Sequence, residues 1–293
     1  MRSPRPIGVN TWVWTSPLTD DRLAALAPRV AGWGFDAIEL PVEEVGDWDA
    51  QQAAKLLESL GLTATLVAAM RPGRELVVAD SRTIAATRDY LCRLVDIAHT
   101  VSSPVVAGPL YASVGRTWRM TESERRACYS QLRENLAPVV EHAHGAGVTI
   151  AVEPLNRFET SVINTVDQAI EALDGLPTDA CGLGLDTFHM NIEEQDIPAA
   201  IRRAGDRVAH VQVCGNDRGA PGADHIDWPG IVEALDEVGY EGPMTIESFT
   251  QDNETMATAA SIWRPLARSQ DAIAVDGLSF LTGLVRGGMP VAR

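Results

Sequence analysis

Four polar side chains follow short apolar segments in the second half of this 293-residue chain. They are Glu153, Asp186, Gln212 and Glu247. A carboxylate at the end of a buried segment loses hydration, which a metal, a substrate or a partner charge must replace. Three carboxylates brought together would repel one another unless a cation lay between them. Oxygen ligands without a thiolate favour a hard divalent ion, so we expect Mn2+ as the cofactor, with Mg2+ or Co2+ as alternatives.

Each of these residues could instead be an isolated polar group that pairs with an arginine at the end of its strand. For one such residue that account would be preferred. The occurrence of four of them on successive segments favours the metal site.

Eight apolar segments are predicted to form strands, and helical segments alternate with them. The strands are expected at 7–14, 37–40, 63–69, 104–108, 149–153, 182–186, 208–213 and 243–247. The helices are expected at 20–30, 49–60, 82–99, 121–144, 165–173, 198–204 and 229–238. This alternation, without a linker, indicates an α/β fold with a single (β/α)8 TIM barrel domain. The four polar residues would then meet at the C-terminal rim, where barrel enzymes keep their active sites.

The barrel is expected to occupy about residues 7–265, and a C-terminal helical extension is expected at 268–293. An extra amphipathic helix within this extension, over 271–285, would pack on the barrel or on a second subunit. We therefore expect an oligomer, either a homodimer or a homotetramer.

The composition excludes several classes of protein. The formal net charge is -16, and binding of nucleic acid or of an anionic membrane needs clustered cations, so neither is expected as a partner. Lys55 is the sole lysine and lies in a helical segment, which argues against Schiff-base and pyridoxal enzymes. Gly32 and Gly34 lack the remaining glycine of a dinucleotide fingerprint and there is no P-loop, so we expect no nucleotide cofactor.

The cysteines and the N-terminal segment indicate a cytoplasmic protein. The four cysteines form no CxxC pair and lie mostly in apolar segments, which is typical of free thiols in a reducing compartment. The first residues carry arginines and prolines but no apolar core of a signal peptide. No apolar run is long enough to span a membrane.

Four segments resemble motifs of the ketose 3-epimerases, which act on tagatose, psicose or ribulose and belong to the sugar phosphate isomerase/epimerase TIM-barrel superfamily. The segments are EPLNRFE at 153–159, LDTFHMNIEE at 185–194, NDRGAPG at 216–222 and IESF at 246–249. The resemblance covers all eight predicted strands and is most specific between residues 153 and 249.

The resemblance implies a role for each matching residue. Glu153 and Glu247 match two glutamates that hold the metal and exchange the proton at C3 of the sugar, and Asp186 matches a third metal ligand. The residues that match groups around the sugar are Glu159, His189 and Arg218.

One residue departs from the family pattern. The fourth metal ligand of these epimerases is usually the second histidine of a His-x-His pair, whereas this chain has His210-Val211-Gln212. Gln212 resembles the ligand of hydroxypyruvate isomerases, whose motif is similar to His-x-Gln. A glutamine carbonyl can bind a hard metal, so Gln212 remains a predicted ligand.

Three tryptophans are candidates for an apolar wall that removes water from the sugar. Trp118 lies in a long loop, 112–120, that could act as a lid, and we predict that it contacts substrate. Trp12 and Trp14 fit a pocket wall and a filled core equally well.

The resemblance, together with the predicted metal site, implies a metal-dependent enzyme that inverts C3 of a free ketose through a cis-enediolate. The cation would acidify the C3 proton, one carboxylate would remove it, and a second group would return a proton on the opposite face. An aldose-ketose or hydroxypyruvate-type isomerase and a keto-sugar lyase or dehydratase could use the same residues. A multi-zinc nuclease would need more histidines and a basic surface, which this chain lacks.

Overall fold

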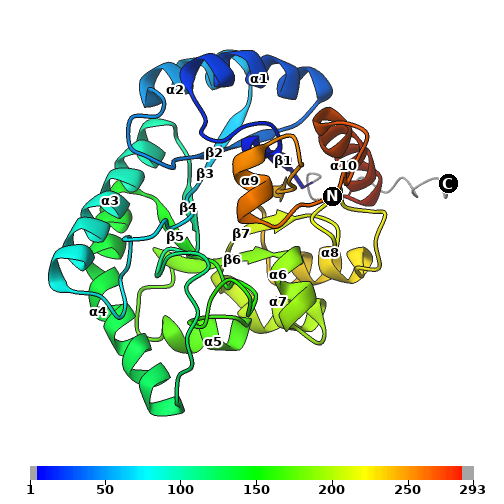
Figure 1. Cartoon of the computed structure of the whole chain (residues 1–293). Helices are drawn as coiled ribbons and strands as arrows, with labels where there is room; N and C mark the ends of the chain where they lie inside the picture. Colours follow the sequence, from blue (N-terminus) through cyan, green and yellow to red (C-terminus); the bar gives the residue numbers. More distant parts are fainter. Residues whose placement is uncertain (1–4, 286–293) are drawn as a thin grey trace.

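Eight parallel strands close into a barrel in the order β1 to β8, with helices around the outside (Figure 1). The structure, a computed structural model, describes residues 5–285. The strands are β1 Ile7–Asn10, β2 Ala37–Pro41, β3 Thr63–Val67, β4 Val105–Gly108, β5 Thr149–Val152, β6 Cys181–Asp186, β7 Val208–Val213 and β8 Met244–Ile246. The predicted TIM barrel is confirmed.

The outer helices follow the strands in sequence. The long ones are α1 Asp20–Trp33, α2 Ala50–Leu60, α3 Ser81–Thr100, α4 Glu122–Ala146, α5 Val166–Ala172, α7 Ile197–Ala204, α8 Trp228–Glu237 and α10 Gln270–Val285. Two short helices, α6 Thr187–Glu193 and α9 Glu254–Ala259, lie in the loops after β6 and β8 and were not predicted.

Local sequence signals set the ends of the helices. The predicted capping box is present at the start of α4, where the Glu124 carboxylate accepts the backbone N–H of Thr121 at 2.7 Å. Gly34, Gly61 and Gly147 end α1, α2 and α4 in the left-handed conformation, which glycine adopts without steric cost. These caps hold the loops on which the strands begin and end.

The first strand is shorter than predicted. It ends at Asn10, and residues Thr11–Val13 form a 3-10 helix, η1. The Asn10 side chain accepts the backbone N–H of Trp12 at 2.8 Å, so a local side-chain bond replaces the continuation of the strand. The expectation that 7–14 is one strand was therefore wrong after Asn10.

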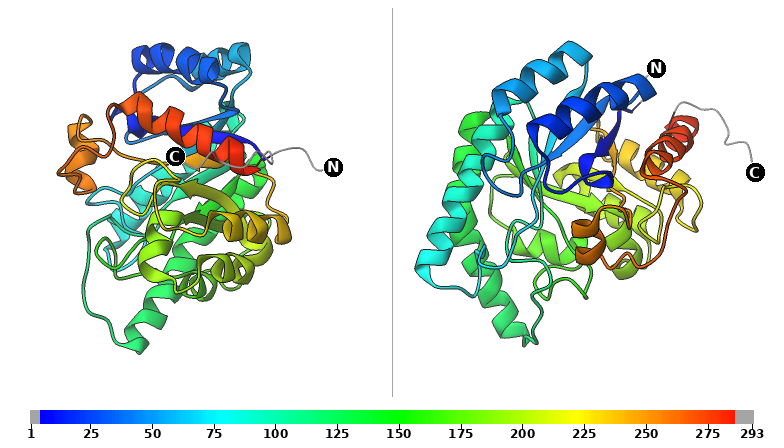
Figure 2. Two further views of the ribbon diagram at one scale, coloured as in Figure 1. Left: turned by 90° about the vertical axis from the view of Figure 1, so that its right-hand side faces the viewer. Right: turned by 45° about the horizontal axis from the view of Figure 1, so that its top comes forward.

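The helix expected at 271–285 is α10, which begins one residue earlier. It lies along the outside of the barrel and packs against β1, β8 and α8 (Figure 2). The remainder of the predicted extension, 286–293, lies outside the described residues. Within residues 5–285, no helix is both long and apolar enough to cross a membrane.

Candidate active site

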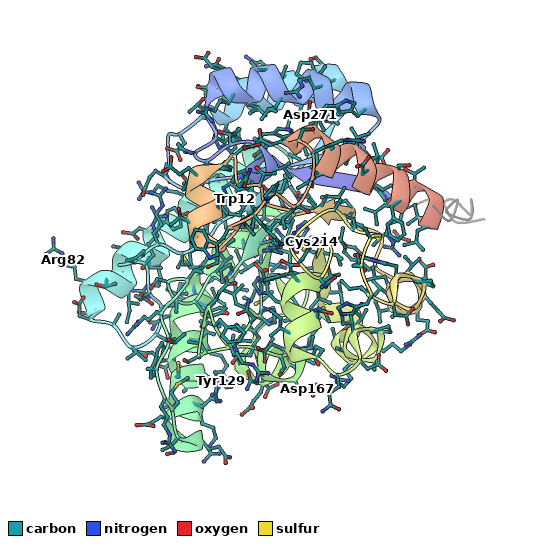
Figure 3. The ribbon with its side chains drawn as sticks, turned by 45° about the vertical axis from the view of Figure 1, so that its right-hand side comes forward. Trp12, Arg82, Tyr129, Asp167, Cys214 and Asp271 are labelled. Carbon is teal, nitrogen blue, oxygen red and sulfur yellow. The ribbon has the colours of Figure 1, made fainter. Side chains whose placement is uncertain are left out.

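A pocket of about 640 Å³ opens at the C-terminal ends of the strands. Five of the site residues predicted from sequence line it: Glu153, Glu159, His189, Arg218 and Glu247. Aromatic residues of the surrounding loops line it as well. In Figure 3, the labelled residues Trp12 and Cys214 lie over the middle of the ribbon, whereas Arg82 projects from its edge.

The four predicted metal ligands stand together at this end of the barrel. Glu153 follows β5, Asp186 ends β6, Gln212 lies on β7 and Glu247 follows β8, and all four are buried. Asp186 and Gln212 are partners in the ladder between β6 and β7, so their side chains leave the sheet at one level. Ligand atoms of Glu153, Asp186 and His189 lie within 4.8 Å of one another.

Arg218 connects two of the carboxylates. One guanidinium nitrogen donates to Asp186, and the other donates to Glu247 Oε2 at 2.8 Å. The guanidinium lies over the rings of Phe188 and Phe249, at 4.7 and 4.6 Å from their centroids. The backbone φ of Arg218 is +71°, a positive value that is uncommon for residues other than glycine and is often found at functional sites.

The side-chain amides of Gln212 and Asn10 and the carboxylate of Glu39 lie next to Glu247 inside the barrel. The Gln212 amide nitrogen donates to Glu39 Oε2 at 2.9 Å and to Glu247 Oε1 at 2.8 Å. The Asn10 amide nitrogen donates to the same two oxygens, at 2.8 and 3.2 Å. The carbonyl oxygen of Gln212 is buried and has no hydrogen-bond donor. This oxygen is therefore available to a ligand that accepts electron pairs.

His189 presents a hydrogen-bond donor to the site. Its Nδ1 atom faces the backbone N–H of Asn156 at 3.1 Å and the Asn156 side-chain nitrogen at 2.9 Å. Because both neighbours are donors, Nδ1 is the acceptor and the proton resides on Nε2. The Nε2 atom lies 3.5 Å from Glu153 Oε1 and 3.7 Å from Asp186 Oδ2. Asn156 also donates to Glu159 at 2.7 Å, so one side chain orients both predicted substrate contacts.

The environment shifts the pKa values of three of these groups. Burial raises the pKa of Glu153 well above its ordinary value, and the nearby charges of Glu247 and Asp186 raise it further. Burial also raises the pKa of Glu247 well above its ordinary value; Arg218 opposes that shift, whereas Asp186 and Glu39 add to it. Burial lowers the pKa of His189, which keeps the imidazole neutral as its contacts require.

The residues fit a bound divalent cation. Four carboxylates are buried at this site, on Glu39, Glu153, Asp186 and Glu247, and one buried guanidinium, that of Arg218, donates to two of them, Asp186 and Glu247. The uncompensated negative charge and the unpartnered Gln212 oxygen are both features that an oxygen-ligated metal ion would satisfy.

The three tryptophans occupy different places. Trp12 lines the pocket, and its indole packs against Phe249. Trp14 instead stacks on Trp33 and donates to Asp271 of α10, so it fills the core. Trp118 is not among the residues that line the pocket, and its substrate contact stays a prediction. Its backbone N–H donates to the Ser161 hydroxyl, its ring faces the Arg116 guanidinium, and it packs against the core.

Several site residues were not assigned a role from the sequence. Glu39 lies in the predicted strand 37–40, but nothing in the sequence connected it to Gln212. Asn10 ends β1, so the rule that found Glu153 could have found it too. No sequence signal pointed to Glu43 and Arg71, which line the far part of the pocket from loops after β2 and β3.

Comparison with known proteins places this geometry in a family. Residues 28–281 match the Xylose isomerase-like TIM barrel family. A "Probable ketose 3-epimerase" of Synechocystis sp. is 33% identical over 276 residues, which cover 94% of each chain. An L-ribulose 3-epimerase of Mesorhizobium japonicum is 32% identical over 289 residues, which cover 98% of this chain and 95% of that one.

The similarity extends to solved structures. A structure of an L-ribulose 3-epimerase superposes with a TM-score of 0.88 at 29% identity, covering 97% of this chain and 95% of the other. A D-allulose 3-epimerase from Methylomonas sp. superposes with a TM-score of 0.87 at 25% identity, covering 96% and 99%. The two curated relatives above, which resemble this chain over nearly its whole length, carry the names of ketose 3-epimerases, and the chain belongs to the xylose isomerase-like TIM barrel family.

Proposed function

We propose that this protein is a divalent metal-dependent epimerase that inverts C3 of a free ketose. The observation that carries the proposal is a pair of buried glutamates, Glu153 and Glu247, that line one pocket of a chain that resembles ketose 3-epimerases. Inversion of a carbon centre requires one group that accepts a proton and a second group that returns one, and two carboxyl groups can fill these roles.

The two glutamates come from different parts of the rim. Glu153 follows β5 and Glu247 follows β8, with β6 and β7 between them in the closed barrel. We assign one of them to removal of the C3 proton and the other to delivery of a proton to the opposite face of the cis-enediolate. Arg218 donates to Glu247 Oε2 and so fixes the direction of that carboxylate.

Three further side chains are assigned to the substrate. The Nε2–H of His189 would donate to a sugar oxygen next to Glu153, because Nδ1 is already occupied by Asn156. Arg218 would donate to the same part of the sugar, and Glu159 would accept from a hydroxyl. Phe188 and Phe249, which flank Arg218, limit the access of water to it.

Glu153, Asp186, Gln212 and Glu247 would hold the cation, and Mn2+ is proposed ahead of Mg2+ and Co2+. When bound, such an ion stabilises negative charge that develops on the substrate oxygens. The excess of buried carboxylates supports this assignment.

Gln212 supports a second candidate, an isomerase of the hydroxypyruvate or aldose-ketose type. Such a reaction transfers a proton between C1 and C2 on one face and could use the same glutamates. The near-complete coverage by 3-epimerases favours the first candidate.

Hydrogen exchange in D2O tests the proposal. The Mn2+-loaded protein is incubated with fructose, tagatose and ribulose, and the sugars are followed by NMR. Deuterium at C3 together with a new diastereomer is the expected result, whereas label or product at C1 or C2 would indicate the isomerase. Failure of every ketose to exchange at C3 would refute the epimerase.

Glu247→Gln is the matched control for this experiment. The variant should fold, as judged by circular dichroism, and should exchange no proton at C3. A rate close to that of the unchanged protein would show that Glu247 does not transfer the proton.

The assembly and the compartment are also proposals. Phe158 at the pocket mouth and Trp263 are each 74% exposed, which supports a homodimer or homotetramer that covers them. The cysteines at 92, 128, 181 and 214 are all free, which supports a reducing cytoplasm.

A further inference from the structure

Glu39 is a buried carboxylate that the proposed reaction does not use. It lies on β2 and is fully buried inside the barrel. Its Oε1 atom accepts from the Thr65 hydroxyl at 3.1 Å and lies 2.6 Å from His210 Nε2. Its Oε2 atom accepts from the amides of Asn10 and Gln212. These hydrogen bonds offset the cost of burying the carboxylate. Two of them join Glu39 to Asn10 and Gln212, which also contact Glu247.

The orientation of the Asn10 amide follows from its neighbours. Asn10 Oδ1 accepts the backbone N–H of Trp12 at 2.8 Å, so the amide nitrogen must be the atom that faces Glu39 and Glu247. Both carboxylate oxygens therefore act as acceptors at this point.

The same two oxygens then determine the orientation of Gln212. Glu39 Oε2 and Glu247 Oε1 lie 2.9 and 2.8 Å from one atom of its amide, and only the nitrogen can donate to both. The carbonyl oxygen is directed away from them and has no partner, although the side chain is completely buried. A flipped amide would place its nitrogen against the ligand position and its oxygen against two acceptors.

We propose that Glu39 is a positioning residue of the metal site, which fixes the Gln212 amide so that its carbonyl oxygen faces the cation. The inference rests on the proposed function, because it takes Gln212 as a ligand. Groups that hydrogen-bond to metal ligands generally orient them, and their loss lowers metal affinity by about 10- to 100-fold. Here β2 acts on β7 across the barrel, since β8 and β1 separate them in the closed order.

Binding of Mn2+ alone, without substrate, tests this role. The metal-free protein is titrated with Mn2+, and free Mn2+ is measured by electron paramagnetic resonance. Glu39→Leu, which removes both acceptor oxygens, should weaken Mn2+ binding by about 10- to 100-fold. Glu39→Gln keeps an acceptor for the two amides and should stay within about 3-fold of the unchanged protein. Thermal unfolding of the metal-free variants shows that they fold, and Glu39→Met takes the place of Glu39→Leu if the latter does not.

The conservative variant separates orientation from charge. If Glu39 acted through its negative charge, Glu39→Gln would lose as much affinity as Glu39→Leu, and the proposal would be overturned. In a Gln212→Leu background the effect of Glu39→Leu should disappear, because the ligand that it orients is absent. Additive losses, or an unchanged affinity in Glu39→Leu, would also overturn it.

The unchanged protein separates this inference from the proposed function. If it binds no Mn2+, the metal assignment fails together with this inference. If it binds Mn2+ and exchanges C3 protons while the variants bind Mn2+ normally, only this inference fails.

Discussion

At the scale of single residues, Glu153 is a buried carboxylate with two other carboxylates, those of Glu247 and Asp186, close to it. The pKa of Glu153 is raised by burial first and by Glu247 and Asp186 next. A raised pKa in the folded protein means that the folded state binds a proton more tightly than the unfolded chain does. Without a cation, the free energy of unfolding therefore decreases as the pH rises above the ordinary carboxyl pKa, near 4.5.

This penalty should be visible in the stability of the metal-free protein. We expect its thermal midpoint in a chelator to fall as the pH rises above the ordinary carboxyl range, by more than the ~2–4 °C that corresponds to 1 kcal/mol. Exposed carboxylates with lowered pKa values, such as Asp49 and Asp80, contribute only below this range, because their stabilisation is lost as the pH falls. In Glu153→Gln the decline should be smaller, since one titrating group is gone. Scanning calorimetry at several pH values measures the slopes; equal slopes in both proteins would contradict the assignment.

At the scale of elements, the sequence predicted the strands because apolar runs alternate with helical segments along the chain, and several of these runs end at a polar residue or a glycine. Polar residues at the ends of such runs gave Glu153, Asp186, Gln212 and Glu247, since the ends of parallel strands converge in a barrel. The helices α6 and α9 escaped prediction because each is an additional helix that precedes another one, α7 or α10, and the alternation of strands and helices requires only one.

The first strand shows a second limit of prediction. Residues typical of strands, Thr11 to Trp14, continue past Asn10, but the Asn10 side chain binds the backbone of Trp12 and the chain turns into η1. Competition between a side chain and the strand ladder depends on geometry, which residue types alone do not supply. The same is true of the contacts that Glu39 makes across the barrel.

Gly108, at the end of β4, helps to position Glu153, a proposed catalytic residue. Its φ is +132°, and an added Cβ would lie 2.1 Å from the backbone oxygen of Ala68 on the neighbouring chain segment. Its own carbonyl accepts the backbone N–H of Glu153 at 2.9 Å. Any displacement of this residue would therefore move Glu153.

We expect Gly108→Ala to destabilise the protein by about 3 kcal/mol or more, because backbone strain and a backbone clash combine. It should also slow C3 exchange in the fraction that folds. Gly175→Ala is the control, since Gly175 also has a positive φ, +86°, but no atom within 4 Å of an added Cβ. Urea unfolding and exchange rates compare the two. Similar losses in both variants would show that the contact with Ala68 does not matter.

At the scale of the whole molecule, the pocket is assembled from loops that follow different strands. Its volume of about 640 Å³ lies in the range of pockets for drug-sized ligands, larger than the rim carboxylates alone require. Strand ends could be predicted because barrel geometry places them, whereas the loops could not. Trp118 illustrates this: its loop, 112–120, contributes Val114 and Gly115 to the pocket wall, but Trp118 itself is not among the residues that line the pocket.

The pocket also contains an ion pair, Glu43 and Arg71, and the side chain of Trp12 lies between this pair and Glu247. Asn10 contacts Glu247 and binds the backbone of Trp12, and the Trp12 indole N–H donates to Glu43 at 3.1 Å. Arg71 donates to the other oxygen of Glu43 at 2.5 Å. On the proposed function, a ketose with C3 beside Glu247 would extend its terminal hydroxyls along Trp12 towards this pair.

Arg71 should therefore distinguish a six-carbon from a five-carbon ketose. We expect Arg71→Met to raise KM for fructose and tagatose by about 10-fold or more, the effect of losing a hydrogen bond to a charged group, while kcat is retained. For ribulose, which lacks the last carbon, KM should change by less than about 2-fold. Arg74→Met is the control, because Arg74 pairs with Glu44 and stacks on Tyr90 but does not line the pocket. Steady-state kinetics on the three sugars measure both constants. An equal rise in KM for hexoses and pentose would place Arg71 outside the path of the substrate and would leave its ion pair with Glu43 a structural role only.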